Sequence, residues 1–256
     1  MKALGIDFGA SFVDAVLFDG KKIIAKRSVA RQEYSPHFLD EFPAFDTVCT
    51  TGSKPHQQMK YYGELESIGD GGLFLTGWEN AVIASCGTGT AIVWKNQLQK
   101  VVHLGGTGLG GGTLMGLGKL LLGSENVDQI LRLAGKGQSK AVDLTVGDIL
   151  GKGIGILSEN ATAANFGKLT NTAYRAEDLA RGLVGMIAET IGVVSCLATR
   201  GIGGGKLVFC GRLSTSVLVQ EDLRQVCRVY DLKPHFLAEA SYVTALGAAL
   251  SCYLPK

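Results

Sequence analysis

The chain has no excess of either charge and contains little proline. Its 256 residues include 25 Lys and Arg against 23 Asp and Glu, a formal net charge of +2, and only five prolines. A nearly neutral chain has no strong electrostatic basis for binding nucleic acid or an anionic membrane, so we expect neither as a partner. No stretch is low in complexity or rich enough in proline to form a disordered linker. The length suffices for one large domain or two small lobes with a real core.

Clustered cysteines and long apolar runs are also missing. The six cysteines show neither a CxxC nor a histidine-paired spacing, which favours a reduced, intracellular compartment without a metal cluster or a disulfide framework. The N-terminus lacks the basic and apolar regions of a secretory signal. The apolar stretches Leu183–Ala198 and Tyr242–Tyr253 are too short to span a bilayer or contain Glu189. These absences predict a cytoplasmic protein.

Glycine, in contrast, is abundant and concentrated in one place. Eight of the fourteen residues from Gly105 to Gly118 are glycine. Because glycine inside a helix costs roughly 1 kcal/mol relative to alanine, such a density needs a reason. The usual reason is a backbone that closely approaches an anion with its N–H groups. A strand-like segment, Leu98–Leu104, precedes the run and a helix-like one, Thr113–Leu122, follows it. The pattern indicates a phosphate-binding turn.

Two familiar glycine motifs do not explain this run. Gly106, Gly108 and Gly111 satisfy the spacing of the dinucleotide fingerprint, but the next segment is polar and helix-like instead of the apolar strand that a βαβ unit requires. A Walker A loop also fails, because Thr113 stands where its first glycine should be and Leu120 replaces the hydroxyl residue.

The remaining pattern alternates strands with glycine turns and then helices, and this plan occurs twice. We expect strands at Ala3–Phe8, Phe12–Phe18, Lys22–Ala30, Thr47–Thr51, Ala81–Ser85, Ala91–Trp94, Leu98–Leu104, Lys206–Cys210 and Pro234–Leu237. We expect helices at 64–76, Thr113–Leu122, Val127–Ala134, Val146–Leu150, Ala161–Leu169, Ala176–Thr199, Val217–Val229 and Tyr242–Tyr253.

Three glycine turns each follow an apolar strand: Asp7–Ser11, Cys86–Thr90 and Cys210–Ser214. Singly, each is a common connection; together they suggest a nucleotide held between two lobes. In the first turn, Asp7 would face a metal-bound phosphate and Ser11 a phosphate oxygen. The second turn would offer backbone N–H groups and the Thr88 and Thr90 hydroxyls, and the third would lie near the base or ribose.

Glu64 is the candidate for acid–base chemistry. A carboxylate at the start of a helix is ordinarily a capping or dipole-stabilising residue. Alternatively, Glu64 is a general base that accepts a hydroxyl proton during phosphoryl transfer. Arg212 also has two interpretations: it is either a nucleotide contact or a solvated turn residue.

Five blocks of the chain form a recognisable set: Gly105–Gly123, Cys86–Thr90, Val142–Asp148, Ala163–Lys168 and Ala245–Ala249. In these blocks, and nearly from end to end, the chain resembles type II, eukaryotic-like pantothenate kinases. The resemblance implies an α/β, two-lobed actin-like ATPase (ribonuclease H-like) fold with mixed sheets flanked by helices. It also implies ATP-dependent phosphorylation of pantothenate to 4'-phosphopantothenate, the first step of coenzyme A biosynthesis, by a homodimer with Mg²⁺ as the cofactor. The long helix Ala176–Thr199 would be an interface element. We expect an N-terminal lobe at 1–78 and a C-terminal lobe at 79–256.

The resemblance also implies roles for individual residues. The family's catalytic glutamate falls on Glu64, and Asp7 would hold the metal. Nucleotide contacts would come from Asp7, Gly9, Ser11, Gly87, Thr88, Gly89, Thr90, Gly108, Gly110, Gly111, Gly112 and Gly211. Acceptor contacts would come from Thr90, His103, Gly105, Gly106, Ala163, Ala164 and Tyr242.

Two positions depart from the family pattern. Asp14 stands where the family usually carries a lysine, and an anion there repels ATP unless it points away or shares a metal. His103 aligns with an arginine that contacts pantothenate, and a mostly neutral imidazole is a poor replacement for a guanidinium fork. Two alternatives therefore stand beside pantothenate kinase. One is a kinase of a different small hydroxyl compound, favoured by His103; the other is a non-enzymatic ATP sensor or assembly protein, favoured by Asp14.

Overall fold

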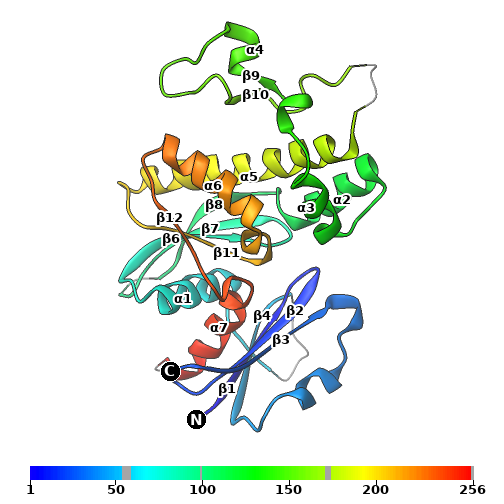
Figure 1. The fold of residues 1–256 in the computed structure, drawn as a ribbon. Coiled ribbons are helices and arrows are strands. Elements are labelled where there is room, and N and C mark those ends of the chain that lie inside the picture. The colour runs from blue at the N-terminus through cyan, green and yellow to red at the C-terminus, as the bar shows by residue number, and fades with distance from the viewer. Residues whose placement is uncertain (54–58, 99, 171–173, 255–256) are drawn as a thin grey trace.

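The computed structural model describes residues 1–53, 59–98, 100–170 and 174–254. It contains two mixed β-sheets flanked by helices, and Figure 1 shows them stacked along the long dimension of the molecule. A helical layer separates the sheets, and an arm (residues 139–170) projects from the far side of the second one. The predicted fold class is confirmed.

The first sheet is built from the N-terminal residues. Its strands are β1 (Ala3–Phe8), β2 (Phe12–Phe18), β3 (Ile23–Ala30), β4 (Thr47–Gly52) and β5 (Lys60–Tyr61), in the order β3-β2-β1-β4-β5. The first three strands are antiparallel, and β4 and β5 extend the sheet in parallel to β1. Alternating side chains of β1 pack on opposite faces, with Leu4, Ile6 and Phe8 against the aromatic rings of Phe38 and Phe42.

The second sheet has the same plan. Its strands are β6 (Asn80–Cys86), β7 (Thr90–Asn96), β8 (Val102–Thr107), β11 (Leu207–Cys210) and β12 (Pro234–Phe236), in the order β12-β11-β6-β7-β8. Again three antiparallel strands are followed by two that run parallel to the first of them. The repeated plan predicted from the sequence is confirmed.

Helices cover both faces of the second sheet. On one face, Val82, Ala84 and Cys86 share a buried cluster with side chains of α5 (Ala176–Gly201) and α6 (Val217–Val229). The helices α2 (Gly111–Leu122) and α3 (Val127–Ala134) complete that layer. On the other face, Ala81 and Ile83 pack with α1 (Glu64–Thr76). A strand buried on both faces reads as a continuous apolar run, as β6 does.

The C-terminal helix returns to the first sheet. α7 (Val243–Leu250) packs with Ala3, Val16 and Phe18, and also against α1 (Figure 1). Gly247 lies against the Ser67 backbone of α1, where a Cβ would collide. The two helices therefore join the sheets through a close crossing. A lobe boundary between residues 78 and 79 stays a prediction. The helix α7 follows that boundary in the sequence but packs on the first sheet.

The arm consists of the strands β9 (Leu144–Thr145) and β10 (Thr162–Ala164), which pair antiparallel, and the helix α4 (Val146–Leu150). The predicted helix at Ala161–Leu169 is wrong. Pairing with β9 extends the backbone there, and Phe166 then takes a left-handed conformation with φ of 56°. Local apolar spacing alone did not distinguish a short paired strand from a helix.

The helix α5 is the one described helix that is long and apolar enough, by length and composition, to cross a membrane. Of its most apolar 18-residue window, 61% is buried inside the molecule. Its apolar face is the one that covers the second sheet.

Most other predicted elements are confirmed within a few residues, including the helix at 64–76. The largest shift concerns β8, which runs to Thr107 and so includes the start of the glycine run. At the C-terminus the predicted helix Tyr242–Tyr253 is α7 flanked by two short 3₁₀ helices, η5 (Ala240–Tyr242) and η6 (Ser251–Tyr253).

Candidate active site

The glycine run packs directly on the second glycine turn. The N–H groups of Gly111 and Gly112 donate to the carbonyl oxygens of Gly87 and Thr88, at 2.8 and 2.9 Å. A Cβ on Gly110 would lie 2.6 Å from the Thr88 carbonyl oxygen, so only glycine permits this approach. The N–H groups of Gly111 and Gly112 are therefore occupied by the protein. For these two residues, the expectation that the run's N–H groups point at an anion is corrected.

The first and second turns meet across the two sheets. The hydroxyl groups of Ser11 and Thr88 lie 3.2 Å apart. Thr90 is buried and donates its hydroxyl to the Leu109 carbonyl at 2.9 Å, which ties the second turn to the glycine run. The turns with Gly9, Gly87 and Gly89 thus lie at one junction, as expected for residues that hold the phosphates of a nucleotide.

Asp7 lies at the end of β1, beside this junction. Burial, together with the negative charges of Glu64 and Asp14, raises the pKa of Asp7 to about 7. The residue as a whole keeps part of its surface exposed, but its Oδ1 is enclosed and has no hydrogen-bond partner among the described residues. An enclosed carboxylate oxygen without a partner is unusual in a native protein and marks a place where a cation or its bound water fits.

Glu64 is the first residue of α1 and is exposed. Two acidic residues begin this helix, and their positions differ. The carboxylate of Glu66 folds back over Gly63, the residue that precedes the helix. The Glu64 side chain has no hydrogen-bond partner within the described ranges, yet it lies near enough to Asp7 to raise its pKa. This arrangement leaves Glu64 available for proton transfer. The carboxylate that lies against the start of the helix is that of Glu66.

Asp14 neither faces the solvent nor lacks a partner. It is the direct cross-strand neighbour of Asp7 and is 8% exposed. Burial raises its pKa, and the Ser28 hydroxyl and the Arg212 guanidinium oppose that rise. Arg212 comes from the third turn, in the other lobe, and donates to Asp14 Oδ1 at 2.7 Å. The lysine-to-aspartate departure is therefore accompanied by a cation from the opposite lobe.

His103 and the first glycines of the run lie on β8 beside a β-bulge. Ile92 of β7 pairs with Gly105 and Val93 pairs with His103, so Leu104 is the extra residue. His103 is exposed, and Gly106 packs against the Thr90 backbone. A bulge re-aims the side chains next to it, which is a common device near functional sites.

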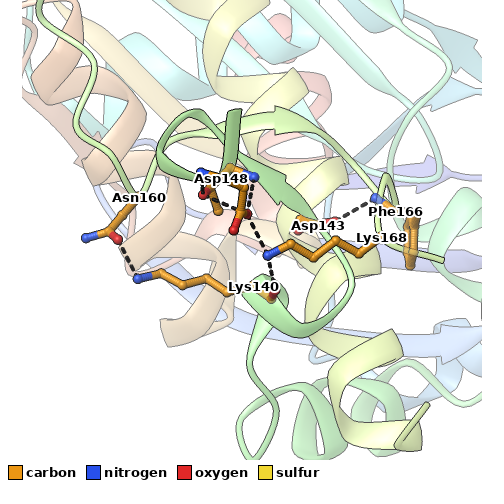
Figure 2. A network of polar contacts seen from close by, with 7 residues as sticks. Lys140, Asp143, Asp148, Asn160, Phe166 and Lys168 are labelled. Carbon is orange, nitrogen blue, oxygen red and sulfur yellow. Dashed lines mark hydrogen bonds and ion pairs between the residues drawn. The ribbon is translucent and has the colours of Figure 1, made fainter. Parts of the chain in front are cut away.

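Ala163 and Ala164 lie in the arm, where a polar network holds their segment in place (Figure 2). Asp143 accepts a hydrogen bond from the Phe166 N–H at 2.7 Å, and Lys168 forms an ion pair with Asp148 at 2.6 Å. Both alanines are exposed. A surface hollow of about 280 Å³ lies beside them, lined by Lys140, Thr145, Gly147, Asp148, Gly151, Glu159, Asn160 and Lys168.

Tyr242, another candidate for acceptor contact, lies far from the arm that contains Ala163 and Ala164. It ends η5, just before α7, and the Lys26 ammonium of β3 stands 5.3 Å from its ring centre. Figure 1 shows α7 next to the first sheet and β10 in the arm, beyond the second sheet. Within one chain, Tyr242 and Ala163 do not form a common site, and their roles as acceptor contacts stay predictions.

The family model that describes "Fumble" matches residues 81–251, from β6 through α7. The chain belongs to the Fumble family.

Curated relatives and solved structures of other proteins are similar to this Fumble-family chain over almost its whole length. It is 27% identical over 268 residues to a type II pantothenate kinase of Bacillus anthracis, with 96% of each chain covered. The activator of 2-hydroxyisocaproyl-CoA dehydratase from Clostridium difficile, solved with ADPNP, has a TM-score of 0.67 at 15% identity and covers 99% of this chain and 94% of its own. A ROK-family glucokinase of Streptomyces griseus, solved with glucose and AMPPNP, has a TM-score of 0.65 at 12% identity, with 98% and 99% covered. These likenesses establish the actin-like ATPase fold.

Sequence reasoning missed the pairing of Asp14 with Arg212. Both residues were noticed separately, but 198 positions separate them in the chain. The one available signal was their opposite charge, and opposite charges so far apart predict no contact. The second missed feature is the Ser11–Thr88 contact between the turns, which also joins distant segments.

Proposed function

We propose that this Fumble-family protein transfers the γ-phosphoryl group of ATP to the primary hydroxyl of pantothenate, which gives 4'-phosphopantothenate for coenzyme A biosynthesis. The observation that carries the proposal is the 27% identity to a type II pantothenate kinase, which extends over 96% of both chains. The actin-like fold is also the fold of neighbours solved with the ATP analogues ADPNP and AMPPNP.

In the proposed mechanism, the hydroxyl oxygen of the acceptor attacks the γ-phosphorus and ADP leaves. Glu64 accepts the hydroxyl proton, a role that fits an exposed carboxylate with no partner among the described side chains. The two turns that meet at Ser11 and Thr88 hold the phosphates, since phosphoryl transfer depends mainly on positioning and charge stabilisation.

Asp7 is the residue that we propose to hold Mg²⁺. Its enclosed and unpartnered Oδ1 fits a cation or a cation-bound water. No group of three or more metal-binding side chains occurs in the described part of the chain, which agrees with a Mg²⁺ bound mainly by substrate phosphates and water. When bound, Mg²⁺ offsets the negative charge of the phosphates.

A second acceptor is favoured by one observation. His103 stands at the position where the resembling family has an arginine for pantothenate, and it is exposed on β8. A kinase of this fold that acts on a different small hydroxyl compound is therefore the alternative. The sensor hypothesis loses its motivation, because Asp14 is paired with Arg212 and no longer stands as an uncompensated anion.

The test is an acceptor assay with purified full-length protein, ATP and Mg²⁺. Pantothenate should produce ADP and a product heavier by one phosphoryl group, as measured by mass spectrometry. Turnover of pantetheine or a simple hydroxy acid, with none of pantothenate, would favour the alternative. No turnover of any acceptor would remove both kinase proposals.

We also propose that the protein is a homodimer. The arm exposes apolar side chains that water disfavours, with Ile149 57%, Ile154 57% and Ile156 77% exposed, and α5 exposes Leu197 at 54%. Sedimentation should give twice the mass of one chain, and Ile154→Asp with Ile156→Asp should shift the protein toward the monomer. A wild-type monomer would contradict this part of the proposal.

A further inference from the structure

We infer that Arg212 binds the phosphate groups of the nucleotide. The inference rests on the proposed use of ATP, but not on the identity of the acceptor. It assigns to the third turn, which was expected near the base or ribose, a contact with the opposite end of the nucleotide.

The three segments that would surround the phosphates supply no positive charge of their own. The segments Asp7–Ser11, Cys86–Thr90 and Gly105–Gly112 contain no lysine, arginine or histidine. Three carboxylates stand near one another at the same place, because the charges of Glu64 and Asp14 both raise the pKa of Asp7. A polyphosphate that enters such a site needs a cation from the protein in addition to any bound metal.

Arg212 is held beside both phosphate turns. Its guanidinium lies 3.9 Å from the ring centre of Phe12, the residue that follows Ser11. Gly211, which precedes it, has φ of +83° and lies so close to Cys86 that a Cβ would come within 2.5 Å of the Cys86 carbonyl oxygen. The backbone at Arg212 therefore lies beside Cys86, where the second turn begins, and its side chain extends to Phe12, next to the first turn.

The hydrogen bonds of Arg212 leave most of its donors available. The Nη2 group donates to Asp14 Oδ1 and to the Ser28 hydroxyl, each at 2.7 Å. The Nε and Nη1 groups have no partner among the residues that the structure describes. The side chain is 41% exposed, whereas the Asp14 side chain is 12% exposed. One nitrogen of the guanidinium is thus anchored, and the other N–H groups of this partly exposed side chain remain without an acceptor among the described residues, as suits a phosphate ligand.

A purely structural reading makes Arg212 a strut that joins the lobes through Asp14. The two readings differ in what they predict for Asp14. If Arg212 is a strut, removing either partner has the same consequence. If Arg212 is a phosphate ligand, removing its charge weakens nucleotide binding, whereas removing the Asp14 charge leaves one more net positive charge at the site.

The experiment measures the Kd of ATP, ADP, AMP and adenosine by calorimetry, with the full chain, Mg²⁺ and no acceptor. Arg212→Gln should raise the Kd of ATP and ADP by about tenfold or more, since a charge-assisted hydrogen bond is lost. The Kd of adenosine should change by less than about twofold. Asp14→Asn should leave the Kd of ATP unchanged or lower it. Arg212→Lys, which keeps the charge, should lie between wild type and Arg212→Gln.

Arg224→Gln is the matched control, because Arg224 also stands over an aromatic ring of the second lobe, 4.6 Å from the centre of Phe236. It should leave all four Kd values unchanged. Equal weakening by Arg212→Gln and Asp14→Asn, an equal loss for adenosine, or no effect of Arg212→Gln would overturn the inference. Because the binding measurements contain no acceptor, they do not depend on which acceptor the protein phosphorylates. Failure to phosphorylate pantothenate would contradict the proposed acceptor but would not affect the test of Arg212.

Discussion

The two lobes share one topology but place different chemistry at equivalent positions. By strand register, Phe8 at the end of β1 corresponds to Cys86 at the end of β6. Gly52, the last residue of β4, then corresponds to Gly211, which follows β11, and their φ angles are 81° and 83°. Each glycine packs on the backbone of the strand end beside it. The same turn geometry is therefore built twice.

The difference lies in the charges. Asp7 and Asp14 of the first lobe correspond to Ser85 and Ala91 of the second. After the paired glycines, the first lobe has Ser53, which hydrogen-bonds to the Phe8 carbonyl, and the second has Arg212. The first lobe thus places two carboxylates at these positions, and the second places an arginine and uncharged side chains. A repeated scaffold positions the groups, while the residues at its turns divide the work.

The third strands also diverge. After β3 the first lobe continues into two 3₁₀ helices, η1 (Arg31–Glu33) and η2 (Pro36–Glu41), whose Phe38 covers the sheet. After β8 the second lobe continues through the rest of the glycine run into α2. At this point the first lobe covers its core with Phe38. The second lobe instead packs the backbone of the glycine run onto its own Cys86–Thr90 turn.

The largest expected effect concerns the division of acid–base work. Glu64→Gln should lower kcat by about 10²–10⁴-fold, because the amide cannot accept the hydroxyl proton, and should leave ATP binding intact. The matched control is Glu66→Gln in the same helical turn, where the carboxylate lies over Gly63. Steady-state kinetics and calorimetry measure the two quantities. Equal losses of kcat in both variants would contradict the role of Glu64.

The next prediction tests the carboxylate pair that only the first lobe has. The folded pKa of Asp7, about 7, is above its ordinary value of 3.8, so the folded protein holds a proton that the unfolded chain releases between those pH values. Stability should therefore fall as pH rises from 4 to 8, by on the order of 4 kcal/mol from this group. Asp7→Asn should remove that fall, as measured by urea unfolding without nucleotide or metal.

Asp231→Asn is the control for this prediction, since Asp231 is exposed and its φ of 53° suits asparagine equally well. It should follow the wild-type pH dependence. If Asp7→Asn also follows it, the buried carboxylic acid in the first lobe is not the cause.

The glycine run of the second lobe should respond to one methyl group. Gly110→Ala should lower the free energy of unfolding by about 1–3 kcal/mol through overpacking, and should weaken ATP binding by moving the Gly87–Gly89 turn. Gly116→Ala in α2 meets no atom within 4 Å and should instead stabilise the protein by about 0.5–1 kcal/mol. Denaturant titrations that rank the two variants in the opposite order would exclude close packing as the reason for Gly110.

The smallest expected effect concerns an ion pair between the lobes. Lys26 of β3 pairs with Glu239 beside η5, and both side chains are well exposed, at 42% and 30%. Lys26→Met should cost less than about 1 kcal/mol of unfolding free energy. Lys95→Met, which breaks the more buried pair with Asp70 inside the second lobe, should cost about 1–3 kcal/mol. Thermal or urea unfolding of both variants provides the comparison, and a larger loss for Lys26→Met would show that the lobes are held mainly at this edge.

Much of the site could be predicted from the sequence because its parts are local. The apolar alternation of Ala3–Phe8 and the helical spacing of 64–76 specify elements, and these place Asp7 at a strand end and Glu64 at a helix start. The helix predicted at Ala161–Leu169 failed because strand pairing with β9 overrides local spacing over only three residues. The glycine run is visible in the sequence, but the partners of its N–H groups could not be known before the Gly87–Gly89 turn was placed beside it.

The sequence by itself determined the two sets of strands, the positions of the glycine turns and the family, because periodicity, turn chemistry and motif order are written along the chain. Only the tertiary structure decided which charges meet. Asp14 and Arg212 lie in different lobes, and their 2.7 Å contact exists because β2 and the turn after β11 lie beside each other where the two lobes meet. A contact of this kind leaves no local signal, since it depends on how two complete lobes close on one another.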